Sequence, residues 1–225
     1  MEKFRKEFLR WGIYLIGMVV LAAGITLNTK TTLGVSPIVS VPYAVSRIWG
    51  MNLGNATFIW YCVFVAAEVL SRLLKRVPGW QRQVMLDLLQ IPLSLVFTRF
   101  MNVFAAFIPE FETAYLGTLM GSLPSRFLFL LLAIILTGTG AALSLNMRIV
   151  PNPGEGIVQA IADLGGWKVG TVKNLFDLSC VLLALAIGLI AARQVIGINV
   201  GTLVAVLGVG RVIGLVNRLW FSDRS

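Results

Sequence analysis

Three ionisable residues in the second half of the chain have types and spacings that suit chemistry. Lys173 and Asp177 are four residues apart, so they lie one helical turn apart on the same face. Glu155 follows Pro153 by two residues, in the first turn of an expected helix. A buried carboxylate binds a cation or an amine, or exchanges a proton once desolvation disfavours its charged form. These residues therefore predict solute binding or proton exchange.

Each feature also has a structural explanation, which stays open. Ionisable residues inside a membrane usually face the bundle interior, where they pair with each other or with a pathway. Lys173 and Asp177 can thus be a neutralised pair that only holds helices together. An acid at a helix start, such as Glu155, is stabilised by the helix dipole and needs no other role.

Membrane helices must position these residues. The chain has 225 residues, of which 57% are hydrophobic and 13% charged, whereas soluble domains carry about a quarter charged residues. Six windows are nearly free of charge and long enough to cross about 30 Å of hydrocarbon. They are residues 11–29, 54–74, 83–108, 124–147, 170–192 and 198–217. We expect an all-α integral membrane protein with six transmembrane helices, the first retained because its apolar run exceeds that of a signal peptide.

Composition argues against several other classes of protein. The chain has no histidine, and its two cysteines, Cys62 and Cys180, fall within expected spans, so we expect no metal site and no disulfide. No phosphate-binding loop of an ATPase and no nucleophile–base pair is visible. We expect no enzyme and no cofactor, with a carboxylate-only mechanism left open. The net charge of +9 fits basic cytoplasmic helix ends better than nucleic-acid binding.

Basic residues predict the orientation, because they gather on the cytoplasmic side of bacterial membranes. They cluster before the first span, between the second and third, and after the sixth. The cluster members are Lys3, Arg5, Lys6, Arg10, Arg72, Lys75, Arg76, Arg82, Arg218 and Arg224. We therefore expect a multi-pass protein of the bacterial cytoplasmic (inner) membrane with both termini in the cytoplasm.

The two halves of the chain repeat each other at a constant offset. Adding 116 to a position in residues 1–110 gives its counterpart in residues 120–225. The matching pairs are Gly24 and Gly140, Leu27 and Leu143, Pro37 and Pro153, Ala44 and Ala160, Gly50 and Gly166, and Gly54 and Gly170. Three spans in each half make the second half inverted relative to the first, which is typical of secondary transporters.

Each half also contains a short helix, predicted over residues 37–49 and 153–165. Proline suits the first helical position, and a glycine about thirteen residues later suits a left-handed cap. Ser36 and Asn152 stand where an N-cap belongs. The short helices either lie on the two membrane faces or enter the membrane from opposite sides as re-entrant helices. The re-entrant arrangement would line a cavity and point backbone amides toward a solute.

Polar residues around these segments complete the predicted cavity wall. Lys30 has an alternative role, because a lysine at the end of a span commonly snorkels to the interface. The candidate solute-binding residues are Asn28, Lys30, Ser36, Pro37, Asn146, Asn152, Pro153, Glu155, Lys173 and Asp177.

Other charged residues fall inside or beside the apolar spans. Glu68 and Arg72 are expected to form an ordinary interfacial pair, since they are four residues apart. Asp87 and Arg211 both lie toward the cytoplasm, so a pairing between them is open, and Arg99 has no evident partner. Small residues in "GTLVAVLGVGRVIG" suit close helix packing or a homodimer contact, of which we prefer packing.

The segments "PNPGEGIVQAI", "GGWKVGTVKNLFDL" and "GINVGTLVAVLGVG" resemble the YczE/YyaS/YitT group of bacterial integral membrane proteins. The matching residues are Pro153, Glu155, Gly156, Lys173, Asp177, Gly201 and Thr202, whereas Gly154 stands where the group usually has arginine. The resemblance covers the six-span chain. It implies the fold and the membrane location, and it implies no particular activity.

These observations favour a secondary transporter or facilitator for a small polar or zwitterionic solute, working by alternating access of two inverted repeats. A proton or a cation is the candidate coupling ion, lipid is the surrounding partner, and no nucleic acid is expected. A non-transporting membrane scaffold or regulator that binds a partner protein is the alternative. The solute, the direction of transport and the oligomeric state are not encoded in any motif.

Overall fold

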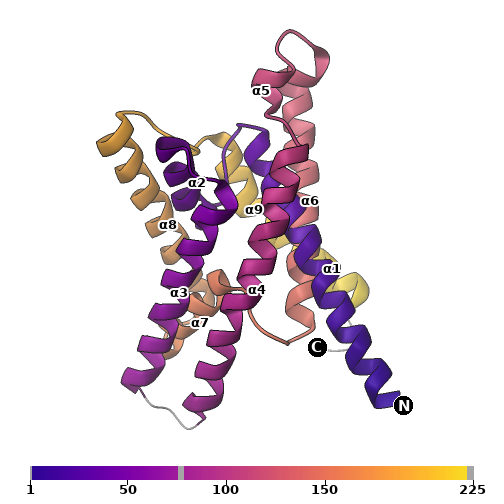
Figure 1. Ribbon diagram of the computed structural model, residues 1–225, viewed down its shortest axis with the longest axis vertical. Coiled ribbons are helices and arrows are strands. Elements are labelled where there is room, and N and C mark those ends of the chain that lie inside the picture. Colours follow the sequence, from indigo (N-terminus) through magenta and orange to yellow (C-terminus); the bar gives the residue numbers. More distant parts are fainter. Residues whose placement is uncertain (1, 76–78, 222–225) are drawn as a thin grey trace. The chain divides into compact units, whose positions relative to one another are not determined.

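The computed structural model describes residues 2–75 and 79–221, so Arg76 and Arg224 lie outside the described residues. Among these described residues, six helical segments are long and apolar enough to cross a membrane, which confirms the expected number of spans. They are α1 (Glu2–Lys30), α3 (Leu53–Lys75), α4 (Trp80–Phe107), α6 (Leu123–Asn146), α8 (Val169–Ile187) with its continuation η2 (Gly188–Ala192), and α9 (Val200–Trp220). Between α4 and α6 lie two short turns, α5 (Phe111–Ala114) and η1 (Leu119–Gly121). The protein is an all-α, multi-pass membrane protein (Figure 1).

The two short helices have the predicted bounds. Helix α2 is Pro37–Trp49 and helix α7 is Pro153–Gly165, each of 13 residues. Each is followed by a glycine in the left-handed region, Gly50 and Gly166, both with φ +66°. Asn152 caps α7 by accepting a hydrogen bond from the Gly154 amide at 3.0 Å. Proline at the start and glycine past the end thus delimit both helices, as expected.

The chain forms two compact units, and each unit combines segments from both halves of the sequence. The first unit holds Met1–Ser36, Phe100–Ile149 and Gly197–Ser225. The second holds Pro37–Arg99 and Val150–Ile196. The first unit therefore contains α1, α6 and α9, and the second contains α2, α3, most of α4, α7 and α8.

Within the first unit, α1 and α6 pack closely because glycines let their backbones approach. A Cβ atom added to Gly24 of α1 would meet Thr137 of α6, at 2.5 Å from its amide nitrogen. A Cβ atom added to Gly140 of α6 would meet Gly17 and Leu21 of α1. Both glycines are therefore required by close helix contact.

Two arginines fix the chain where α1 and α6 end. Arg126 donates a hydrogen bond to the carbonyl oxygen of Thr31 at 2.9 Å, and Arg10 donates one to the carbonyl oxygen of Met147 at 2.8 Å. The residue after each of these carbonyls, Thr32 and Arg148, has a positive φ, 57° and 49°. The same turn thus follows both helices.

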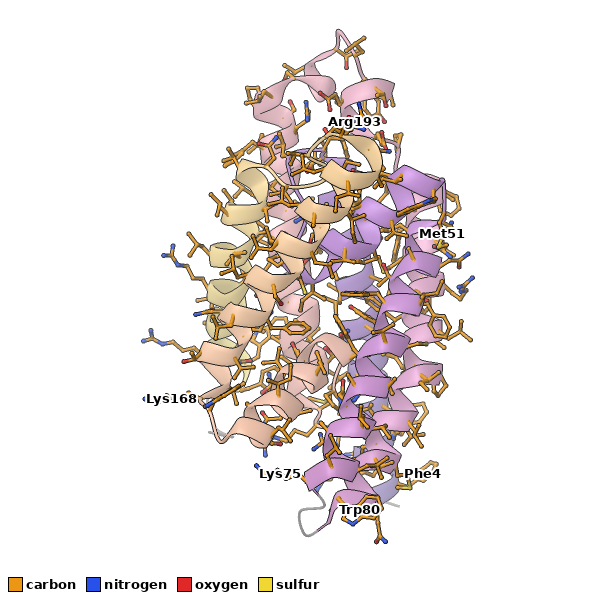
Figure 2. The ribbon with its side chains drawn as sticks, turned by 90° about the vertical axis from the view of Figure 1, so that its left-hand side faces the viewer. Phe4, Met51, Lys75, Trp80, Lys168 and Arg193 are labelled. Atoms are coloured by element: carbon orange, nitrogen blue, oxygen red, sulfur yellow. The ribbon has the colours of Figure 1, made fainter. Side chains whose placement is uncertain are left out.

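Within the second unit, α3 packs on α7 and α2 packs on α8 (Figure 1). Figure 2 shows Lys75 and Lys168 at one end of this unit and Met51 and Arg193 at the other. The N-terminal part of α4 joins α3 through a series of side-chain contacts. At one end of that series, Arg99 donates a hydrogen bond to Asn55 at 2.6 Å, which gives Arg99 the partner that the sequence did not suggest.

Candidate functional site

The start of α7 lies inside the second unit and is stabilised by its own cap. The backbone amides of Gly154, Glu155 and Gly156 all donate hydrogen bonds to Asn152, the first to its side chain and the others to its carbonyl oxygen. Amides that already have acceptors offer little to an anionic solute. The expectation that these amides point to a solute stays a prediction, which the capping bonds of Asn152 make less favourable.

Two residues from the other elements meet this helix start. A Cβ atom on Gly154 would lie 3.0 Å from the Ile38 side chain, so the first turns of α2 and α7 are in contact. Tyr61 of α3 is buried, lies close to the Asn152 side chain, and stacks on Phe97 of α4 with ring centroids 6.1 Å apart. Tyr61 thus ties the α7 cap to the α3–α4 pair.

Glu155 is the chemically available group at this position. Within the described residues, its Oε2 atom is enclosed and has no hydrogen-bond partner. Helix α7 is not one of the six spans, and burial raises the pKa of Glu155 to about 7, an effect that the positive charge of Lys173 partly offsets. A carboxyl group in this state can accept a hydrogen bond from an ammonium group or exchange a proton near neutral pH.

Lys173 and Asp177 form the predicted ion pair on α8. The Lys173 ammonium lies 2.6 Å from Oδ1 and 2.7 Å from Oδ2 of Asp177. The lysine side chain is 38% exposed and the aspartate side chain 16% exposed. Because Asp177 already neutralises Lys173, the lysine compensates the charge of Glu155 only in part.

A second polar cluster lies on α3 and α4 and was not predicted. Glu68 is fully buried and accepts a hydrogen bond from Gln90 at 2.7 Å. Arg72 donates a hydrogen bond to Asp87 at 2.6 Å. The expected interfacial pair of Glu68 with Arg72 is therefore wrong, because the acid is buried and the arginine is engaged by Asp87. The pairing of Asp87 with Arg211 that the sequence left open is wrong for the same reason.

A glycine of α7 makes room for the Glu68 carboxyl group. A Cβ atom on Gly156 would lie 2.5 Å from Oε2 and 2.7 Å from Oε1 of Glu68. Real Cβ atoms essentially never come this close, so a side chain at position 156 would force the Glu68 carboxyl group to move. Because Gly156 follows Glu155 in the chain, α7 connects the two carboxyl-containing sites.

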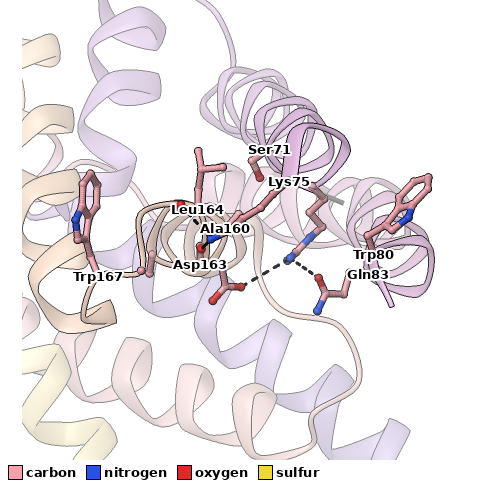
Figure 3. A pocket seen from close by; sticks show the side chains of 11 residues that line it. Ser71, Lys75, Trp80, Gln83, Ala160, Asp163, Leu164 and Trp167 are labelled. Carbon is pink, nitrogen blue, oxygen red and sulfur yellow. Dashed lines mark hydrogen bonds and ion pairs between the residues drawn. The ribbon is translucent and has the colours of Figure 1, made fainter. Parts of the chain in front are cut away.

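A pocket of about 370 Å³ opens at the Lys75 end of the second unit, next to the Glu68 cluster. Arg72 lines it, donates a hydrogen bond to Gln83 at 2.7 Å and lies 3.9 Å from Asp163 (Figure 3). Lys75 donates hydrogen bonds to the backbone carbonyls of Asp163 and Leu164 at the end of α7. The pocket thus carries both signs of charge, and two tryptophans, Trp80 and Trp167, flank it on opposite sides (Figure 3).

Comparison with known proteins places the chain in a family. The model of the family of unknown function DUF6198 matches residues 8–218. The chain belongs to this family. An uncharacterized membrane protein, YczE of Bacillus subtilis (strain 168), is 24% identical over 181 residues, which are 80% of this chain and 75% of that protein. No solved structure gives a significant match. The predicted resemblance to the YczE group is confirmed.

The candidate residues of this DUF6198 chain divide between its two units. The second unit holds Pro37, Asn152, Pro153, Glu155, Lys173 and Asp177, and the first holds Asn28, Lys30, Ser36 and Asn146. In the first unit, Asn28 is buried, and its Oδ1 atom has no partner among the described residues. Asn146 donates a hydrogen bond to Asn217 at 2.7 Å. The candidate site of the DUF6198 chain is therefore described from the residues of the second unit alone.

Proposed function

We propose that the protein is a secondary transporter or facilitator that moves a small polar or zwitterionic solute, with an ammonium group held by Glu155, across the bacterial cytoplasmic membrane. The observation that carries this proposal is the enclosed, unpartnered Oε2 atom of Glu155 next to the ion pair of Lys173 and Asp177. The protein acts by transport rather than by catalysis, with both termini in the cytoplasm.

Reciprocal contacts support two inverted repeats in the first unit. Gly24 contacts Ala133 and Thr137, and Gly140 contacts Gly17 and Leu21. Subtracting 116 from Ala133, Thr137 and Gly140 gives Gly17, Leu21 and Gly24, so each contact recurs with its partners exchanged. Such exchange is the property of a two-fold axis. In a six-span chain the axis would lie in the membrane plane, as in transporters with inverted halves.

The arginine contacts and the turns obey the same rule. Arg10 and Arg126 differ by 116, and so do the residues whose carbonyls they bind, Met147 and Thr31. The positive-φ residues that follow, Thr32 and Arg148, also differ by 116. These features involve charged side chains and positive-φ turns, so shared apolar composition does not account for them.

The burial pattern of the short helices supports re-entrant rather than surface helices. An amphipathic helix on a membrane face exposes one side along its whole length. In α2, every residue from Val39 to Ala44 is buried, whereas Arg47 and Trp49 at its end are exposed. In α7, exposure likewise increases toward Gly165. Both helices are thus enclosed at their N-terminal halves, as expected for helices that enter the protein end-on.

The chemistry at α7 favours a solute with a positive group. The first amides of α7 are used by Asn152, so a helix-dipole site for an anion is weak here. Glu155 offers an acceptor oxygen, and Lys173, though paired with Asp177, offers the positive charge that a zwitterion's anionic end needs. A zwitterion or an organic cation therefore fits better than an organic anion.

Binding and flux of three probes test this proposal. Glycine betaine, ethanolamine and lactate represent a zwitterion, a cation and an anion, and ligands of the native state raise its apparent stability. We expect thermal stabilisation by a probe with a positive group and uptake of the same probe into proteoliposomes. Both effects should be lost in Glu155→Gln and kept in Glu7→Gln, which makes the same change on an exposed side chain. Equal uptake by wild type and Glu155→Gln would remove Glu155 from the mechanism.

Thiol accessibility separates transport from the scaffold alternative. Cysteines placed singly at positions 36 and 152, in a chain without Cys62 and Cys180, report whether water reaches the starts of the short helices. A transporter with alternating access should allow labelling from both sides of the membrane. Protection of both positions from both sides would favour a scaffold.

A further inference from the structure

The fully buried Glu68 has a neighbourhood that no part of the proposed solute site uses. Its charged neighbours are Arg72 on its own helix and Asp87 on α4, both of which act electrostatically on its carboxyl group. Gln90 of α4 donates to Oε2, and the Gly156 backbone of α7 lies against both carboxyl oxygens. The remaining acid near the cluster, Asp163 of α7, lies 3.9 Å from Arg72. Glu68 is thus enclosed by α3, α4 and α7.

The charges around Glu68 do not balance without a proton. Asp87 is 2% exposed, and its Oδ2 atom forms an ion pair with Nε of Arg72 at 2.6 Å. Among the described residues no cation forms an ion pair with Glu68 itself. A buried charge without a partner is so costly that the group takes up a proton instead.

Two buried oxygens of this cluster lack partners. Oε1 of Glu68 and Oε1 of Gln90 have no hydrogen bond among the described residues. Two free oxygens are far fewer than the about six that a hard metal cation takes. The cluster therefore suits a proton better than a metal cation.

The pocket at the end of the unit provides access to this cluster. Arg72 lines the pocket, binds Asp87, and acts electrostatically on Glu68 one helical turn away. Glu68 in turn lies against Gly156, next to Glu155. Polar groups thus continue from the pocket to the solute site within one unit.

We propose that Glu68 carries one proton, which enters through this pocket, and that this proton is the coupling ion of the transporter. The step is a reversible proton transfer: a hydronium ion in the pocket releases a proton, the Glu68 carboxylate accepts it, and water is left, with no covalent intermediate. The coupling role rests on the proposed transport function, whereas proton binding by Glu68 does not.

Infrared spectroscopy of the full-length protein in lipid tests the proton site without any solute. A protonated carboxylic acid has a carbonyl-stretch band that ionised carboxylates lack. Because Glu155 also titrates near neutral pH, Glu155→Gln serves as the parent protein. We expect one buried acid band in this parent, its loss in the variant that also carries Glu68→Gln, and its retention with Glu7→Gln. An identical band with and without Glu68→Gln would overturn the proposal.

A second variant tests whether Glu68 holds the proton because Asp87 engages Arg72. Asp87→Asn frees Arg72, which then neutralises Glu68 directly, so the acid band should disappear although Glu68 is present. A band that persists in Asp87→Asn would contradict this cause of the protonation. Each variant's thermal unfolding curve, measured alongside, shows that it is folded.

Coupling is tested with the probe that binds in the thermal assay, in proteoliposomes under an imposed pH gradient. We expect the gradient to drive uptake by wild type, and Glu68→Gln to equilibrate the probe without responding to the gradient. Uptake driven by a sodium gradient instead would replace the proton by a metal cation and overturn the proposal. An acid band without any flux would leave the proton site intact and refute the transport function, so the two failures are distinguishable.

Discussion

The second unit contains two helix pairs that differ mainly in what they bury, α3 on α7 and α2 on α8. With the offset of 116 residues, Gly156 corresponds to Ser40 and Glu68 corresponds to Ala184. Ser40 and Ala184 are both fully buried, and Ser40 donates a hydrogen bond to the carbonyl oxygen of Cys180 at 3.2 Å. The α2–α8 pair thus has small residues at the two positions that correspond to Gly156 and the buried acid Glu68 in the α3–α7 pair.

This difference indicates that the packing itself does not need an acid at Glu68. An uncharged residue of similar size at this position would avoid the desolvation that a carboxyl group suffers. The acid is accompanied by three residues specific to its side of the unit, since Gln90, Arg72 and Gly156 correspond to Val206, Gly188 and Ser40. We take this set as a functional addition to a repeated scaffold.

The largest effect should come from removing the positive charge of Arg72, which lies beside the buried acid of the α3–α7 helix pair. Arg72→Met keeps much of the side-chain length but leaves Asp87, which is 2% exposed, without a cation. Breaking a buried ion pair in this way costs about 3–5 kcal/mol of unfolding free energy. Thermal unfolding in detergent measures the loss, with Arg99→Met, whose side-chain contact is exposed, as the matched control. Equal stability of the two variants would contradict the buried ion pair.

A pH series on Glu155, whose counterpart is Val39, should give an effect of about 3 kcal/mol. The pKa of Glu155 is raised from 4.5 to about 7 by burial, so between these values the native state binds more protons than the unfolded state. The unfolding free energy contributed by this group is therefore fully present below pH 4.5 and is lost as the pH rises through about 7. Glu155→Gln should lack this component. Thermal unfolding of both proteins over this pH range measures it, and parallel curves would contradict the prediction.

A methyl group at position 156 tests the close contact between Gly156 and the Glu68 carboxyl group. The added Cβ atom in Gly156→Ala must displace the Glu68 carboxyl group from Gln90, and overpacking of this kind costs about 1–3 kcal/mol. Gly170→Ala is the matched control, since a Cβ atom there meets nothing within 4 Å. The measurement is the difference in thermal stability between the two variants. Combining Gly156→Ala with Glu68→Ala should relieve the clash, so a cost that persists unchanged in the double variant would argue against this contact.

Much of the fold could be predicted from the sequence because its signals are local. Apolar length defines the six spans, and proline and glycine define α2 and α7 to the residue. The Lys173–Asp177 pair was also predictable, since four-residue spacing within one helix fixes its geometry.

The Glu68 cluster was not predictable by the same reasoning. The four-residue spacing of Glu68 and Arg72 suggested a pair, but contacts with α4 direct Arg72 to Asp87 and Glu68 to Gln90. The signal that was present in the sequence is an asymmetry of the repeat, with Glu68 and Gly156 opposite Ala184 and Ser40. Which of two helices an interior side chain faces depends on tertiary packing, and no local pattern encodes it.

The smallest effect concerns the cap of α7, where the repeat has Asn152 opposite Ser36. Asn152→Ala removes the acceptor of the Gly154 amide and the side chain close to Tyr61, at a cost of about 1 kcal/mol. Asn152→Ser restores the cap with the residue of the other half but is too short to reach Tyr61. We therefore expect thermal stability in the order wild type, Asn152→Ser, Asn152→Ala. If Asn152→Ser is no more stable than Asn152→Ala, the side chain acts through Tyr61 rather than as a cap, and the two short helices then begin for different physical reasons.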